Sequence, residues 1–357
     1  GNHDLELYWP SVQQHVRDAL RLDPEQQSRL VFCEWFYISG GDTFCCHGHL
    51  FDAYCTIRDP IHPLISVYGR PRVRIPFGDL AERYMLNGMG YFNPHATENF
   101  IMTLPEYIRF YVKYMVRDQP LLLFTWFWSA MVVLATTLWT FWRPAMRDPL
   151  TIEEKVNNIA AKANATPSQV RMLNQLHAPS AATNPLQILQ ELWLDRGFLF
   201  LGLLYLAFQI VAWMKAFFAV HWLWVLLPIA LMFPLYLSYS FKVRSATFVD
   251  PLLSEHRATL LDRIIGVKRV VMGHTHVPEH RTIGPIEFLN SGFWSPAFAE
   301  PECINRIGTQ TFVWVRRDEA GSPAQVWEWP PDGDEPLLFD VSDPLRKKQR
   351  QESEDAG

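Results

Sequence analysis

The chain has 357 residues, enough for more than one domain, and a formal net charge of −5. The acidic balance argues against a nucleic-acid-binding protein, because such a protein presents a basic face to phosphate. The five cysteines are odd in number and include no C-x-x-C pair. A disulfide framework is therefore not expected, and a reducing compartment is the simpler interpretation.

Two polar motifs lie in the first fifty residues. Gly1-Asn2-His3-Asp4 precedes a helix predicted over residues 11–20, and His47-Gly48-His49 follows two strands predicted over 30–38 and 43–46. Asparagine and histidine supply the oxygen and nitrogen ligands that suit transition metals. Asn-His-Asp is also ordinary turn chemistry. Cys45 and Cys46 are expected to fill a buried strand, with a metal role as the alternative.

Long apolar segments occupy the middle of the chain. Residues 121–142 contain no charged side chain. At about 1.5 Å of rise per residue, a helix of this length crosses a hydrocarbon core of about 30 Å. A second region, 197–241, is interrupted only by Lys215 and is too long for one span, so it divides into about 198–217 and 219–241. The sequence predicts three membrane helices, with a buried soluble helix as the alternative for 121–142.

A polar segment, residues 148–195, separates the two apolar regions. Ile152, Val156 and Ile159 recur at helical spacing after Thr151, which is a good N-cap residue. We expect a small helical linker that keeps the membrane segments apart. A cover over the candidate site is the alternative.

The third motif, Gly273-His274-Thr275-His276, follows a helix predicted over 257–266 and a strand predicted over 268–272. Side chains at i and i+2 of an extended segment point the same way, and imidazoles presented in this way make good ligands for a transition metal. Gly273 permits a turn with positive φ. A strand with a tight turn over 287–294 and a hairpin of 311–316 and 324–329 should follow. The polar tail, 331–357, is expected to be disordered.

In this order, the three motifs resemble those of the calcineurin-like metallophosphoesterase superfamily. The segments 47–52, 273–278 and 290–294 are most similar to the UDP-2,3-diacylglucosamine diphosphatase-like branch, which cleaves a pyrophosphate in a lipid-linked nucleotide sugar. The resemblance implies an α/β fold: a four-layer β-sandwich flanked by helices, here with an inserted α-helical membrane region. Its two parts would be residues 1–108 and 246–330, separated by the insertion 109–245.

The resemblance also implies a site for two divalent transition-metal ions. Asn2, His47 and His274 would hold one ion, and His276 would reach the other. Mn, Fe, Zn and Co all suit mixed nitrogen and oxygen ligands, so the motifs do not select one metal. The superfamily's D-x-H and G-D-x-x-D motifs are not found in the chain. We therefore expect residue 1 to be an artificial start and the chain as given to be inactive.

The same resemblance implies supporting roles for other residues. His3 would be the catalytic acid or charge stabiliser beside the scissile phosphate, and Asp4 and His49 would line or support the site. The substrate-binding residues are unknown, although Arg58 or Arg70 could bind phosphate. These expectations describe a membrane-anchored dimetal phosphoesterase or pyrophosphatase in which metal-bound hydroxide attacks a phosphate ester. A lipid-linked substrate is favoured over a soluble one, and a catalytically inactive membrane interaction protein of the same fold is the alternative.

Membrane topology imposes a parity condition. His47 and His274 can share an ion only if they lie on one side of the membrane, so an even number of crossings must separate them. Three predicted spans break this condition, and one of them must lie elsewhere. Arg196 and Lys242 flank the longer apolar region. They favour a hairpin with both ends, and the catalytic domain, on the cytoplasmic side.

Overall fold

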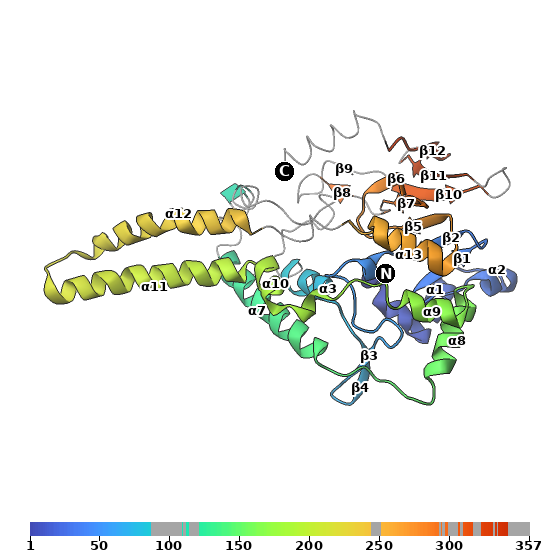
Figure 1. Ribbon diagram of the computed structural model, residues 1–357, viewed down its shortest axis with the longest axis horizontal. Helices are drawn as coiled ribbons and strands as arrows, with labels where there is room; N and C mark the ends of the chain where they lie inside the picture. Colours follow the sequence, from blue (N-terminus) through green and yellow to red (C-terminus); the bar gives the residue numbers. More distant parts are fainter. Residues whose placement is uncertain are drawn as a thin grey trace.

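The computed structural model describes residues 1–86, 109, 112–113, 121–243, 251–292, 294, 297–298, 306–307, 310–316, 323–330, 333 and 335–341. It is a mixed α/β body from which a hairpin of two long helices projects (Figure 1). These helices are α11 (Leu194–Phe217) and α12 (Leu226–Lys242). The predicted combination of an α/β fold with long apolar helices is confirmed at this level.

A five-stranded sheet forms the centre of the body, in the order β1-β2-β5-β7-β6. Its strands are β1 (Phe36–Ser39), β2 (Thr43–Cys46), β5 (Arg269–Met272), β6 (Pro278–Ile283) and β7 (Ile286–Ser291). The central pairs β2–β5 and β5–β7 are parallel, and the outer pairs are antiparallel. Parallel pairing brings the carboxyl ends of β2 and β5 to one edge, where the second and third motifs begin.

A second, antiparallel sheet packs against the first. It contains β10 (Gln310–Val315), β11 (Ala324–Trp329) and β12 (Leu337–Leu338), and the predicted β10–β11 hairpin is confirmed. Leu289 of the first sheet is buried with Ala324 and Val326 of the second. The sequence predicts a disordered tail over residues 331–357, but strand β12 lies within this range and pairs with β11. Residues 342–357 lie outside the described residues. The full four-layer arrangement stays a prediction.

The polar segment 148–195 is part of the body and does more than separate membrane segments. It contains α8 (Ile152–Lys162), α9 (Pro167–Leu173), η5 (Ala181–Thr183) and α10 (Pro185–Glu191). The apolar faces of α8 and α9 join the core that covers the sheet, together with α13 (Glu255–Ile265). The backbone of Ala163 accepts a hydrogen bond from Ile38 N of β1 at 2.9 Å. The expectation of a separating linker is therefore corrected: an amphipathic face needs a core to cover, and the sheet provides it.

Several short elements precede the apolar helices. The amino-terminal part holds η1 (Asn2–Tyr8), α1 (Pro10–Ala19), α2 (Pro24–Arg29) and η2 (His49–Phe51). Next come the hairpin of β3 (Leu64–Val67) and β4 (Arg70–Val73), then α3 (Phe77–Ala81) and the π-helix η3 (Glu82–Leu86). Strands β8 (Ala297–Phe298) and β9 (Arg306–Ile307), which follow the apolar helices in the chain, form a separate two-stranded sheet.

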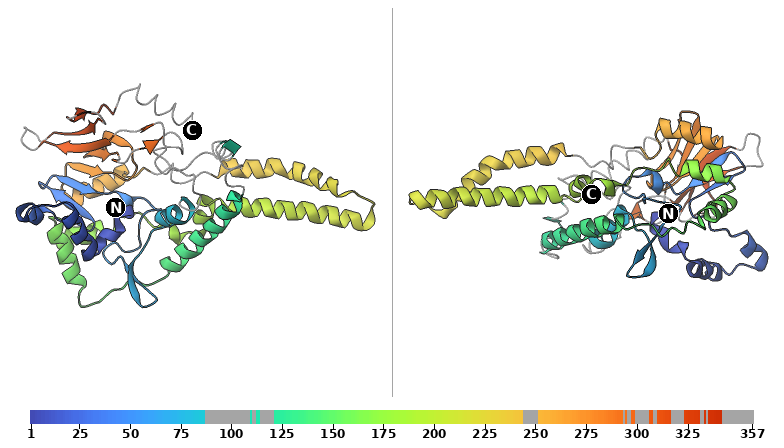
Figure 2. Two further views of the ribbon diagram at one scale, coloured as in Figure 1. Left: turned by 180° about the vertical axis from the view of Figure 1, so that it is seen from behind. Right: turned by 60° about the horizontal axis from the view of Figure 1, so that its bottom comes forward.

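Three helices in the described part of the chain are long and apolar enough to cross a membrane: α7 (Leu122–Phe141), α11, and α12 with the preceding turn η6 (Trp222–Val225). Figure 2 shows α11 and α12 leading away from the sheets side by side. In contrast, α7 packs on the body, where Ala130 and Val133 are buried in a cluster with residues of α3, α10 and α11. The three helices therefore have two different environments.

Candidate metal centre

Three chain segments that are far apart in the sequence bring the predicted ligands together. Asn2 is buried, and its Oδ1 lies 2.9 Å from His47 Nε2. The rings of His47 and His274 lie 5.3 Å apart between centroids. The β2–β5 pairing explains this contact, because Gly273 N donates a hydrogen bond to His47 O at 3.1 Å. Metal–ligand bonds of about 2.0–2.1 Å put neighbouring ligand atoms about 3 Å apart, so Asn2 and His47 fit one ion.

Asp79 of α3 determines which way the Asn2 amide points. Its Oδ1 accepts a hydrogen bond from Asn2 Nδ2 at 2.7 Å, which turns Asn2 Oδ1 toward His47. Burial raises the pKa of Asp79 to about 6. An outer carboxylate that orients a ligand is a regular part of metal sites. The motifs gave no sign of Asp79, because the contact depends on α3 folding back onto the first turn of the chain.

Two glycines make room around His47. A side chain at Gly1 would place its Cβ 2.7 Å from His47 Nδ1. Gly48 has φ of 107°, and a Cβ there would lie 3.0 Å from Leu252 and 3.4 Å from His274 Cβ. Both positions therefore need glycine for close packing, and Gly48 also needs it for its backbone conformation.

The third motif adopts a turn different from the expected one. Positive φ falls on His274 (70°) and His276 (62°), whereas Gly273 is not among the positive-φ residues. Left-handed backbone at residues other than glycine carries strain and clusters at functional sites. Gly273 instead permits close approach of β7, since its Cβ would lie 3.4 Å from Ser291 Oγ. The expectation that Gly273 carries the positive φ is wrong, because the positive φ angles of this loop occur at His274 and His276.

Asn290 of β7 holds this strained loop. It is buried, and its Nδ2 donates to Gly273 O at 2.7 Å and to Thr275 Oγ1 at 2.9 Å. Its Oδ1 accepts a hydrogen bond from Gly292 N at 2.9 Å. One amide therefore links the loop after β5 to the turn after β7. This gives a physical reason for the Asn-x-Gly sequence at residues 290–292.

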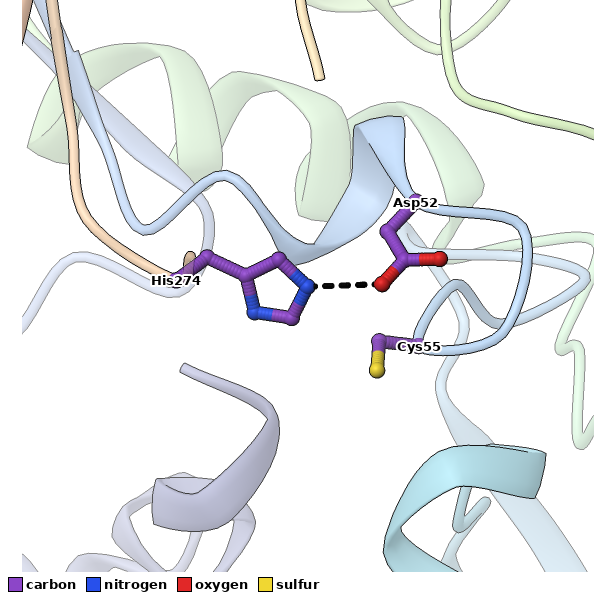
Figure 3. Close-up of side chains that lie close together, drawn as sticks. All are labelled: Asp52, Cys55 and His274. Carbon is purple, nitrogen blue, oxygen red and sulfur yellow. Dashed lines mark hydrogen bonds and ion pairs between the residues drawn. The ribbon is translucent and has the colours of Figure 1, made fainter. Parts of the chain in front are cut away.

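His274 also contacts a second group of potential ligands (Figure 3). Its Nε2 lies 2.9 Å from Asp52 Oδ2, and the ligand atoms of Asp52, Cys55 and His274 all lie within 4.8 Å of one another. Burial raises the pKa of Asp52, but the hydrogen bond and charge of His274, together with the hydrogen bonds from Tyr54 N and Cys55, outweigh burial and lower that pKa. Burial raises the pKa of the Cys55 thiol, which therefore stays protonated without an ion. We interpret Asp52 as the carboxylate that orients His274, whose Nδ1 lies on the other side of the ring (Figure 3).

His3 is placed as an accessible acid beside the ligands. Its Nδ1 lies 2.9 Å from Glu82 Oε2, and its Nε2 lies 3.2 Å from Asn2 Nδ2. The hydrogen bond to Glu82 raises the pKa of His3 above its ordinary value. About half of the side chain (47%) is exposed, so a ligand can reach the ring.

The remaining predicted residues lie at varying distances from this centre. The ring of His49 is 5.4 Å from that of His47, and its buried Nδ1 has no hydrogen-bond partner among the described residues. His276 lies close enough to His47 to contribute to lowering its pKa. Asp4 is exposed, with its carboxylate 3.5 Å from the Gly1 amino group. Arg58 stacks on Phe141 of α7.

Comparison with known proteins adds no further identification. No family model matches the chain, and neither a curated protein nor a solved structure matches it. The resemblance to calcineurin-like enzymes therefore rests on the three motifs alone.

Proposed function

We propose that the protein is a membrane-anchored, metal-dependent phosphoesterase or pyrophosphatase of the calcineurin-like type. The observation that carries this proposal is the convergence of Asn2, His47 and His274 from three distant segments, with Asn2 Oδ1 2.9 Å from His47 Nε2. These residues would hold one divalent ion and His276 would reach a second. Bound ions of this kind polarise phosphoryl oxygens and lower the pKa of a coordinated water.

The protonation states of the chain's own residues suit this role. Burial lowers the pKa of His47 to about 3. Its ring is therefore neutral at physiological pH, with a lone pair available for an ion. Asp52 accepts from His274 Nε2, which leaves Nδ1 as the nitrogen that can ligate.

His3 would act as the proton donor to the departing oxygen of the substrate. Glu82 holds its Nδ1, and the raised pKa keeps a proton on the ring in a larger fraction of molecules near neutral pH. About half of the His3 side chain (47%) is exposed, which allows a substrate to approach the ring. General acids of this kind contribute about 10²–10⁴-fold to rate.

Metal binding is the first test, because it can be measured on the chain itself. Titration calorimetry with Mn²⁺ on the protein in detergent micelles should show binding that His47→Ala abolishes. The matched control is His15→Ala, which removes an exposed imidazole from α1 and should leave binding unchanged. Equal affinity in all three proteins would contradict the assignment of this centre.

Hydrolysis is the second test, made on the full-length protein. An aryl phosphate diester or a nucleotide diphosphate should be cleaved with Mn²⁺, and chelator or His47→Ala should stop the reaction. Metal binding without turnover would favour the alternative, a catalytically inactive membrane interaction protein. Turnover that is insensitive to chelator would overturn the proposal.

A further inference from the structure

One face of helix α7 is buried against the rest of the protein. Ala130, Val133 and Thr137 are buried and share one side of the helix. That side contacts α3, η3 and α10, within the cluster that also contains Tyr54 and Leu80. A helix covered by the body along its middle turns cannot be surrounded by lipid there.

The carboxyl end of α7 lies on the body, and its amino end lies against the base of the hairpin. At its carboxyl end, the buried Arg74 guanidinium donates to the carbonyl oxygens of Thr140 (2.6 Å), Phe141 (3.1 Å) and Arg143 (2.7 Å). Just beyond this end of the helix, Ala145 forms an antiparallel β-bridge with Ile65 of β3. Near its amino end, the ring of Phe127 packs edge-on against Phe198 at the start of α11, 5.8 Å between centroids. A spanning helix would instead carry one end away from the body.

The opposite face of α7 is exposed and aromatic. Its large apolar side chains fall on one side of the helix, and Trp128 and Trp142 are 63% and 73% exposed. The face consists of Leu121, Phe124, Trp128, Trp139 and Trp142. Tryptophan prefers the boundary between hydrocarbon and water, where its ring is apolar and its N–H is hydrated.

Basic side chains continue this face past the end of α7. The guanidinium of Arg143 lies 3.7 Å from the centroid of the Trp139 ring, and Tyr68 at the β3–β4 turn lies 6.2 Å from the same ring. Tyr68 is 87% exposed, and the exposed Arg70 and Arg72 follow it on β4. Aromatic rings beside arginines form a surface that fits the headgroups of anionic lipids.

The hairpin has the dimensions of a membrane crossing. On α11, charged residues occur at Asp195 and Arg196 and next at Lys215, a rise of about 28 Å, which matches a hydrocarbon core of about 30 Å. At the base, Arg196 Nη2 donates to Val243 O at 2.7 Å, which joins the two helices. At the far end, Lys215 Nζ lies 4.7 Å from the Trp222 ring centroid. Figure 1 shows the hairpin on one side of α7 and the sheets on the other.

We propose that α7 is not a membrane span. It lies along the surface of an anionic bilayer, with its aromatic face and the β3–β4 turn among the headgroups, while α11 and α12 cross that bilayer. Helix α7 lies beside the base of the hairpin, where Phe127 packs on Phe198, and this position identifies the lipid surface as the partner of its aromatic face. Two crossings separate His47 from His274 among the described residues, so the parity condition is met. The inference does not depend on phosphoesterase activity.

Depth measurements distinguish the two placements. Spin labels at Leu121, Ala135 and Trp142 would be read by paramagnetic relaxation in nanodiscs that contain phosphatidylglycerol, with the unsubstituted chain as the labelling blank. A surface helix should give one shallow depth, about 5–10 Å, at all three positions. A spanning helix would give a shallow–deep–shallow profile with its maximum near Ala135, and that result would overturn the proposal. A label at Leu206, midway along α11, should be deep, which verifies insertion of the hairpin.

The headgroup contact has its own test. With a label at Tyr68, the depth should be greater in phosphatidylglycerol nanodiscs than in phosphatidylcholine nanodiscs. Substitution of both Arg70→Glu and Arg72→Glu should remove this difference. Arg263→Glu, which changes an exposed charge on α13, should retain it. A Tyr68 label that is fully accessible to water in both lipids would refute contact of the β3–β4 turn with the membrane.

Discussion

At the scale of single residues, the metal centre depends on side chains that orient the ligands. Asp79 directs the Asn2 amide, Asp52 engages His274, and Asn290 restrains the loop that carries His274. The three motifs sufficed to predict Asn2, His47 and His274 as neighbours. They could not reveal Asp79, because an aspartate in a short helix becomes informative only when the tertiary fold places it against Asn2.

Substitution of Asp79→Asn should weaken metal binding. The variant has nearly the same volume, but its side-chain amide can donate to Asn2 and allow the Asn2 amide to turn its oxygen away from His47. Loss of an orienting partner typically lowers metal affinity by about 10–100-fold. Calorimetric titration with Mn²⁺ measures this, with Asp18→Asn on the exposed side of α1 as the matched control. An affinity within twofold of the unsubstituted protein would speak against the orienting role.

Substitution of Asn290→Ala should destabilise the fold near the third motif. It removes the side-chain acceptor of the buried Gly292 N–H and one of the two donors to each of Gly273 O and Thr275 Oγ1, at a cost of about 1–3 kcal/mol. Urea denaturation followed by circular dichroism should report the loss. Asn157→Ala on the exposed side of α8 is the control and should change stability far less.

At the scale of elements, apolar patterns predicted the strands that lead into the motifs. Thr43–Cys46 and the segment after Lys268 are strongly apolar and short, which is typical of buried strands. Strand β4 escaped prediction because Arg70–Val73 contains two arginines and a proline. The helical period of α8 was visible in the sequence, but a period does not say which surface the apolar face will cover.

Substitution of Ile159→Ala tests whether α8 belongs to the core. The side chain is buried with Val156 and Val170 in the cluster that covers the sheet. Deleting a buried isoleucine to alanine costs about 2–5 kcal/mol. Chemical denaturation in detergent should show this loss, and Asn158→Ala on the opposite side should be nearly neutral. If Ile159→Ala left the free energy of unfolding unchanged, α8 would be better described as part of a separating linker.

At the scale of the whole molecule, the candidate site is closely tied to the membrane hairpin. Tyr54 Oη, two residues after Asp52, donates to Glu191 Oε1 at 2.7 Å and accepts from Gln187 Nε2 at 2.8 Å. Glu191 ends α10, and α11 begins three residues later. The loop beside His274 therefore packs on the helix that leads directly into the hairpin. This contact links the candidate site to the hairpin that we propose to cross the membrane.

The substrate preference should reflect this arrangement. If the substrate is lipid-linked, a long-chain phosphate ester in micelles should give a higher kcat/KM than its short-chain analogue, because the bilayer supplies it close to the site. The comparison is made at matched surface concentrations in detergent. Equal specificity constants, or preference for a water-soluble nucleotide, would leave a tethered phosphoesterase with a soluble substrate.

The parallel pairing of β2 with β5 also orders events during synthesis. Residues 43–46 emerge from the ribosome long before residues 269–272, and the hairpin α11–α12 is made between them. At about 5–20 residues per second, β2 waits roughly 10–45 s for its central neighbour. If the hairpin crosses the membrane as proposed, the bilayer receives it before the sheet can close. The candidate metal ligands are then split into one set translated before membrane insertion and one set translated after it.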